Sequence, residues 1–189
     1  MTKAQYKDLP DEELVRLIAQ ENKTELFELL YKRYFLKVVD KCYSFIKNRS
    51  MAEDFANDIF SKAFEKLPGF KGNAHFSSWL YAITYNYSID YLRLKKKLHY
   101  PNWNTENEIQ DIPDESEADL QDLSYDNLLQ ILEMIHPEEK ALLLMKYQDN
   151  LPGKSIAQTL RISEDAVKMR LKRARTRVIY LYQTKFEKD

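Results

Sequence analysis

Residues 154–175 read KSIAQTLRISEDAVKMRLKRAR, which has the spacing of a helix-turn-helix motif. The apolar residues of the first helix are Ile156, Ala157 and Leu160, and those of the second are Val167, Leu171, Ala174 and Val178. Ser163 is suited to cap the second helix, because its hydroxyl can accept a hydrogen bond from a first-turn amide. Arg161 stands in the turn, where a left-handed backbone favours glycine or asparagine and costs other residues a modest free energy. The stretch predicts a small helical domain.

The second helix of this motif also has a basic side, which comprises Lys168, Lys172, Arg173, Arg175 and Arg177. Such a helix suits the major groove of DNA, where lysine and arginine bind phosphates and guanine edges. The alternative is an ordinary helical hairpin with a solvated basic surface. The small Ala157, at a position where two helices cross closely, and the Ser163 cap favour DNA binding.

Charge divides the 189 residues into distinct zones. Residues 71–100 carry five basic groups against one acid (+4), residues 101–126 carry nine acids and no base (−9), and residues 151–189 carry ten bases against four acids (+6). Two basic zones that end amphipathic helical patterns favour contact with phosphates. Helical periodicity dominates on both sides of the acidic stretch, without a convincing strand pattern. We therefore predict an all-α protein of two small helical domains, 1–97 and 125–189, joined by an acidic flexible linker, 98–124.

Several classes of protein are disfavoured by the composition. Cys42 is the single cysteine, so neither an intrachain disulfide nor a thiolate zinc site is expected. No stretch approaches the roughly 18 apolar residues of a membrane helix, and the N-terminus is too polar for a secretory signal. The three histidines are isolated, and no glycine-rich phosphate loop or metal-ligand spacing is present. We expect a cytoplasmic protein that is not an enzyme and has no metal, no cofactor and no membrane insertion.

The stretch FSSWLYAITYNYSIDYLRLKKK (76–97) predicts a helix with one face that begins apolar and becomes polar and basic. That face comprises Trp79, Ala82, Ile83, Asn86, Asp90, Arg93 and Lys97. Trp79 is expected in the core. Asn86 is either a satisfied buried amide or a side chain that reads a base edge, and the spacing leaves both open. A platform for base stacking is suggested by four tyrosines, Tyr81, Tyr85, Tyr87 and Tyr91. Such aromatic stripes more often pack within a protein core.

Four passages together resemble a bacterial RNA polymerase sigma factor of the extracytoplasmic-function subfamily, the minimal two-domain type. They are LFELLYKRYFLKVVDKCY (26–43), AEDFANDIFSKAFEKLPGF (52–70), FSSWLYAITYNYSIDYLR (76–93) and the helix-turn-helix. With helices predicted over 128–148, they cover nearly all of the chain outside the linker and the N-terminal residues. The resemblance implies a transcription initiation factor that binds core RNA polymerase, recognises the promoter −10 and −35 elements and promotes promoter melting.

The resemblance assigns core binding and the −10 element to the first domain. Docking on the clamp coiled coil of the polymerase's largest subunit is implied for Asp54, Asn57, Asp58 and Lys62. Asn57 and Asp58 stand where the family commonly has Gln-Glu, each shorter by one methylene. The pocket for a flipped non-template base corresponds to Phe70, Ile83 and Asn86, with Lys71 and Asn73 nearby, and the remaining −10 contacts are Asp90, Arg93, Lys96 and Lys97. Stacking and hydrogen bonds would offset the cost of extruding the base.

The second domain is similar to the module that reads the −35 element and touches the flap of the second-largest subunit. The groove-facing residues that this implies are Lys168, Met169, Lys172, Arg173 and Arg175. The chain departs from the family pattern at Pro152, Gly153, Ser155 and Arg161. Either the promoter consensus is therefore unusual, or another protein recruits this factor. An anti-sigma factor is a further partner that the resemblance implies.

Two questions remain open at the level of the sequence. The acidic linker either threads the RNA path of the polymerase, as the resemblance implies, or is a solubilising spacer. The rival function is an autonomous helix-turn-helix regulator that binds duplex DNA without polymerase. That rival leaves the 76–97 passage unexplained, and a purely protein-binding adaptor would not need two basic zones.

Overall fold

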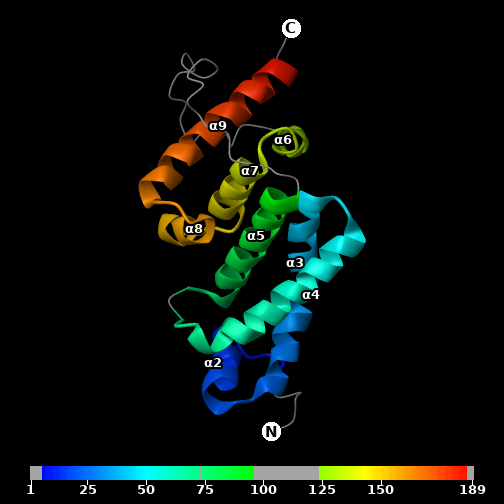
Figure 1. Cartoon of the computed structure of the whole chain (residues 1–189), viewed down its shortest axis with the longest axis vertical. Helices are drawn as coiled ribbons and strands as arrows, with labels where there is room; N and C mark the ends of the chain where they lie inside the picture. Colours follow the sequence, from blue (N-terminus) through cyan, green and yellow to red (C-terminus); the bar gives the residue numbers. More distant parts are fainter. Residues whose placement is uncertain (1–5, 73, 96–123, 187–189) are drawn as a thin grey trace. The chain divides into compact units, whose positions relative to one another are not determined.

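The computed structural model describes residues 6–72, 74–95 and 124–186, and within these ranges every regular element is a helix (Figure 1). The all-α prediction is confirmed. The chain divides into two compact units, Met1–Tyr91 and Leu92–Asp189. Apart from Ser124, the predicted linker lies outside the described residues, and the domain limits at 97 and 125 stay predictions. No helix of the described ranges is both long and apolar enough to cross a bilayer.

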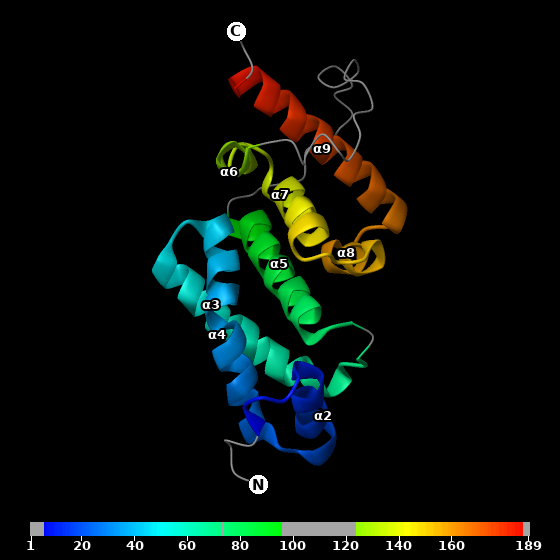
Figure 2. The same ribbon diagram turned by 180° about the vertical axis from the view of Figure 1, so that it is seen from behind.

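Among the described residues, the first unit contains α2 (Asp11–Glu21), α3 (Phe27–Ile46), α4 (Arg49–Lys66) and α5 (Phe76–Lys95) as far as Tyr91. Short 3₁₀ turns, η1 (Thr24–Leu26) and η2 (Leu67–Gly69), precede α3 and follow α4. The sharp connection between α3 and α4 depends on Lys47, which takes a left-handed φ of 58°, and on Asn48, whose side-chain oxygen accepts from the Met51 amide at 3.0 Å. α4 runs obliquely across α3 in Figures 1 and 2, and the two helices are in contact.

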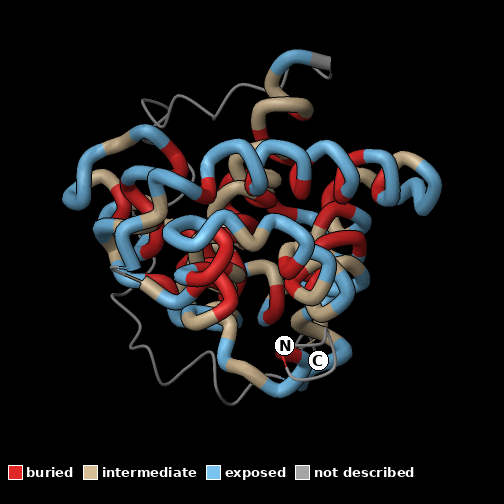
Figure 3. The backbone as a smooth tube through the Cα atoms, turned by 90° about the horizontal axis from the view of Figure 1, so that it is seen from below, coloured by how far each residue is buried: buried red, intermediate tan, exposed pale blue. Residues whose placement is uncertain are grey.

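Close packing of the first unit depends on small residues of α4. Ala52, Ala56 and Ala63 are fully buried, and their short side chains let α4 approach α3 closely. Buried and exposed residues alternate along the helices in Figure 3, so that each helix has one side in a core.

Burial on α5 differs from the predicted pattern. The inner side of this helix comprises Phe76, Leu80, Tyr85 and Ile89, each no more than 1% exposed. Trp79, predicted in the core, is only partly buried and packs at the core's edge. The prediction was wrong because α5 is apolar on nearly all sides, and the packing of α3 and α4 decides which side is buried.

The second unit is arranged around the long helix α9 (Glu164–Phe186), which contacts α6 (Tyr125–Leu132), α7 (Pro137–Leu143) and α8 (Gly153–Leu160). Its core includes Ile131, Leu142, Met145, Ile156 and Val178. Within the stretch 128–148, predicted as helical, α7 is followed directly by the π-helix η4 (Leu144–Gln148). His136 caps α7, accepting from the Glu138 amide at 3.2 Å.

The helix-turn-helix formed by α8 and α9 has the predicted geometry. Arg161 adopts the left-handed conformation (φ 58°, ψ 45°) that ends α8. The Ser163 hydroxyl accepts from the Ala166 amide at 3.1 Å, which is the predicted cap. The predicted stripe of Val167, Leu171, Ala174 and Val178 is buried. Because the stripe is buried, the opposite side of α9 faces solvent and can contact a partner.

Candidate nucleic-acid interface

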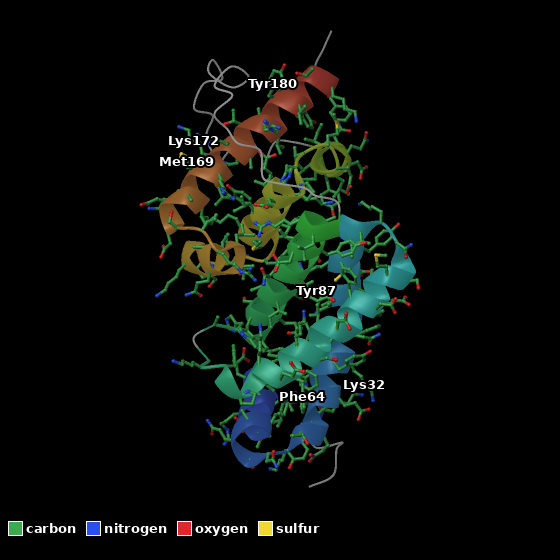
Figure 4. All side chains as sticks on the ribbon, viewed as in Figure 1. Lys32, Phe64, Tyr87, Met169, Lys172 and Tyr180 are labelled. Carbon is green, nitrogen blue, oxygen red and sulfur yellow. The ribbon has the colours of Figure 1, made fainter. Side chains whose placement is uncertain are left out.

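The outward side of α9 presents three neighbouring side chains. Lys168, Met169 and Lys172 are exposed, with Met169 at 52%, and Met169 and Lys172 lie close together in Figure 4. The Lys168 ammonium lies 3.4 Å from the carboxylate of Asp165 one turn earlier, and both side chains are largely in solvent. A helix side with two exposed cations beside an exposed apolar side chain can meet phosphates and the thymine methyl group.

The arginines of α9 lie differently from the lysines. Arg173 and Arg175 are partly buried, and the Arg175 guanidinium donates to the Tyr147 hydroxyl of η4 at 3.0 Å. Arg177 lies 3.8 Å from the carboxylate of Glu139 on α7. The structure therefore separates Arg175 and Arg177 from the exposed lysine pair, and both stabilise the packing of α9. A DNA contact by Arg173 or Arg175 stays a prediction.

Glu139 is a buried carboxyl group of α7 that lies near Arg177 of α9. It is 0% exposed and accepts from the His136 amide at 3.2 Å. Burial raises the pKa of Glu139, and the attraction of Arg177 and the His136 amide offset this only in part. No sequence pattern indicates this ion pair, because Glu139 and Arg177 come from α7 and α9 and meet only in the fold.

The predicted base-reading side of α5 is partly buried. Ile83, Asn86 and Asp90 have intermediate exposure, as has Arg93 in the last turn. Trp79 lies on the same side, with its ring centroid 5.2 Å from that of Phe70. The structure thus brings an aromatic pair to the junction between the loop and α5. Lys71 is exposed in that loop, whereas Asn73, Lys96 and Lys97 lie outside the described residues.

The start of α5 is also held by α2, which the sequence did not indicate. A carboxylate oxygen of Glu12 lies 3.1 Å from His75 Nδ1 and accepts from the Phe76 amide at 3.4 Å. These contacts join residues more than 60 positions apart. The pKa of Glu12 is lowered mainly by a hydrogen bond from its own backbone amide and further by the bond from His75. The loop before α5 is therefore positioned partly by the N-terminal helix, through a half-exposed carboxylate.

All four residues predicted to bind core polymerase are exposed on α4. The Tyr31 hydroxyl of α3 donates to Asn57 at 3.0 Å, and the Tyr87 hydroxyl of α5 donates to Asp58 at 2.6 Å. The Lys62 ammonium lies 4.1 Å from the Tyr87 ring centroid. Burial, together with the carboxylate of Asp58, raises the pKa of Tyr87 to about 12, so its hydroxyl stays protonated and can donate. Tyrosines of α3 and α5 thus hold Asn57 and Asp58 in place. We call the exposed row of Asp54, Asn57, Asp58 and Lys62 the polar edge of α4.

A groove of about 540 Å³ runs beside this polar edge, between α4 and the start of α3. Its aromatic lining is Phe27, Tyr31, Phe60 and Phe64, and its polar lining includes Asn57, Glu25 and Glu28. Phe64 is 41% exposed and meets Phe27 edge to face at 5.0 Å. We refer to this feature as the aromatic groove. Sequence reasoning missed it, because helical periodicity does not distinguish a core phenylalanine from one at a groove.

The second unit has the helix-turn-helix and exposed lysines that are typical of DNA-binding proteins. Comparison with known proteins makes this class more specific. Residues 30–98 match the family Sigma-70 region 2, and residues 120–178 match the family Sigma-70, region 4. The chain is 30% identical over 151 residues to the ECF RNA polymerase sigma factor SigW of Bacillus subtilis, covering 74% of this chain and 79% of SigW. This chain belongs to the extracytoplasmic-function family of RNA polymerase sigma factors.

Other relatives agree with this assignment. The RNA polymerase sigma-H factor of Pseudomonas aeruginosa is 24% identical over 174 residues, covering 87% of this chain and 90% of that protein. The fold is similar to that of CnrH, solved in complex with the cytosolic domain of CnrY, with a TM-score of 0.61, 19% identity and coverage of 93% and 98% of the two chains. RpoE from Bartonella quintana, solved with the anti-sigma factor NepR, has a TM-score of 0.57 and 16% identity to this chain. The match covers 84% of this chain and 98% of RpoE.

Proposed function

We propose that this sigma factor divides its work between the two units: α4 docks on the clamp coiled coil of the polymerase, α5 with its preceding loop captures a melted −10 base, and α9 reads the −35 element. The observation that carries the proposal is the exposure of two separate faces, one on each sigma-70 region. Asp54, Asn57, Asp58 and Lys62 are exposed on α4, and Lys168, Met169 and Lys172 on α9.

Docking on core polymerase would use both the polar edge of α4 and the aromatic groove. The polar edge offers acceptors for basic side chains of the partner, and the groove offers apolar surface between two glutamates. A partner helix with an apolar side chain flanked by arginine or lysine satisfies both features. Binding of this kind needs no catalytic residue, in keeping with an initiation factor that is not itself an enzyme.

Capture of the base would use the side of α5 that holds Asn86. An amide there can donate to and accept from the Watson–Crick edge of a flipped base. The neighbouring Phe70–Trp79 pair offers aromatic surface on which such a base can stack. Holding the flipped base shifts the duplex equilibrium towards the melted state without ATP. Arg93, Lys96 and Lys97 would hold phosphates, and the acidic linker would follow the RNA path.

Partners beyond polymerase and promoter are proposed on two grounds. RpoE of Bartonella quintana was solved with an anti-sigma factor, and we propose a regulator of this kind for the present chain. The chain departs from the family pattern at Pro152, Gly153, Ser155 and Arg161. Because these departures would weaken reading of the −35 element, we propose that another protein recruits this factor to weak −35 elements. Lys168 and Lys172, the two exposed lysines of α9, would still contact the DNA in that case.

The test is transcription by the full chain with core RNA polymerase on a library of random templates, with sequencing of the transcript starts. A shared promoter sequence upstream of the starts is expected. Asn86→Ala should reduce open-complex formation more than it reduces binding to core polymerase. Equal loss of both would assign Asn86 to folding. Absence of promoter-dependent transcripts together with absence of core binding would overturn the whole proposal and leave the autonomous regulator, which should bind duplex DNA tightly by itself.

A further inference from the structure

Two adjacent acids in the first turn of α2 hold the start of α5. One carboxylate oxygen of Glu12 lies 3.1 Å from His75 Nδ1 and accepts from the Phe76 amide at 3.4 Å. The first amides of a helix have no partner within it, so Glu12 acts as a cap supplied by another helix. Asp11 acts indirectly: it accepts from the Tyr34 hydroxyl, and the Tyr34 ring meets that of Phe76 edge to face at 5.6 Å.

The loop between η2 and α5 is anchored at both of its ends. At the first end, the Phe70 amide donates to the Leu67 carbonyl at 3.0 Å and closes η2, which contacts α2. The Phe70 ring lies 6.5 Å from that of Phe76, centroid to centroid. Between the two ends, Gly72 adopts a φ of 69°, which glycine tolerates without strain. Because α2 contacts both ends, it limits the positions that the loop can take relative to α5.

The pocket that we propose for a −10 base is built from both sides of this junction. Phe70 belongs to the loop, whereas Ile83 and Asn86 belong to α5. Hydrogen bonds need a donor–acceptor distance of about 3 Å and a nearly straight angle, so an amide distinguishes base edges only when the base is held in one position. A loop that moved relative to α5 would still bind a base by stacking, which every base allows, but would distinguish bases less well.

We propose that Glu12 is a positioning residue for recognition of the −10 element: it holds His75 and the Phe76 amide, keeps the loop fixed against α5, and thereby increases the discrimination between bases in the pocket. The inference rests on the proposed function for the pocket itself. Glu12 lies outside residues 30–98, which match Sigma-70 region 2, so the family assignment alone does not supply this role. Glu12 needs no contact with DNA or polymerase, because it acts through the loop.

The experiment measures the rate of open-complex formation by the full chain with core RNA polymerase. Templates carry the preferred −10 sequence, identified from the sequenced transcript starts, or one of the other bases at its most selective position. Glu12→Ala should reduce the ratio of the two rates about fivefold, which corresponds to the loss of about 1 kcal/mol, the contribution of one hydrogen bond. The dissociation constant for core polymerase should stay that of the parent. Glu12→Gln, which keeps an acceptor oxygen, should recover most of the ratio.

The matched control is Glu13→Ala, which removes the same charge from the next position of the same helical turn. Glu13 is paired at 2.8 Å with Arg16 of its own helix, and its side chain is 40% exposed against 49% for Glu12. The control should keep the parent ratio. An equal fall in both variants, no recovery in Glu12→Gln, or a matching loss of core binding would overturn the positioning role. If the parent discriminates between bases and Glu12→Ala does so equally, only that role is wrong, whereas a parent without any −10 preference would overturn the proposed pocket as well.

Discussion

Phe64 allows the docking proposal to be tested with a magnitude taken from the structure. It is 41% exposed at the aromatic groove, and its buried part meets Phe27 at 5.0 Å. A phenylalanine has about 200 Å² of surface to bury, so about 80 Å² remains for a partner to cover. At about 25 cal/mol for each Å², covering that area contributes about 2 kcal/mol. Phe64→Ala should therefore weaken binding to core polymerase about 30-fold, because each 1.4 kcal/mol changes a dissociation constant about tenfold.

The assay is a competition measurement of the dissociation constant, with labelled parent chain bound to core RNA polymerase and each variant as the competitor. Phe64→Ala also removes packing within the unit, so a matched control is needed. Tyr43 is also an aromatic residue of the first unit and is also 41% exposed, but it does not line the groove. Tyr43→Ala should lose stability in urea yet keep the parent affinity. Unchanged binding by Phe64→Ala, or the same loss in both variants, would refute the role of the groove.

Three further predictions concern the second unit. Burial raises the folded pKa of Glu139 above 4.5, so its contribution to stability is fully present below pH 4.5 and is lost as the pH rises through the folded value. The unfolding free energy of the parent should therefore fall as the pH rises above 4.5, relative to that of Glu139→Gln, in urea titrations. Lys172→Ala should weaken binding of holoenzyme to every promoter duplex alike and reduce the salt slope by about 0.9, whereas Lys185→Ala, near the other end of α9, should not. Arg161→Gly should raise the unfolding temperature, since relief of its left-handed backbone (φ 58°) is worth about 1 kcal/mol, and Arg161→Ala should give no such gain.

Features that depend on local chemistry could be predicted from the sequence. The Ser163 cap, the left-handed Arg161 and the buried stripe of α9 each follow from residues within a few positions of one another, and all three are confirmed. Asp54, Asn57 and Asp58, which the resemblance implied for docking, fall on one side of α4 by the helical period, and all three are exposed.

Features that depend on which helices meet could not be predicted in this way. α5 carries aromatic or aliphatic residues on almost every side, so its periodicity did not indicate that Tyr85 is buried and Trp79 lies at the edge. The aromatic groove needs Phe27 and Phe64 from different helices. Glu12 reaches His75 across 63 positions, and no local pattern predicts such a contact. These residues are the ones that shape the surfaces proposed to bind partners.

The fold explains the shorter side chains of the α4 edge that we propose docks on polymerase. Asn57 and Asp58 stand where the family commonly has the longer glutamine and glutamate. Each has one rotatable bond fewer, and each accepts from a tyrosine hydroxyl, Tyr31 on one flank and Tyr87 on the other. Holding a side chain before the partner arrives lowers the entropy lost on binding, by about 0.5–1.5 kcal/mol for a flexible one. The side chains of the edge are therefore shorter but better ordered, and a partner must approach α4 closely to reach them. A partner whose apolar side chain enters the adjacent aromatic groove would approach in this way.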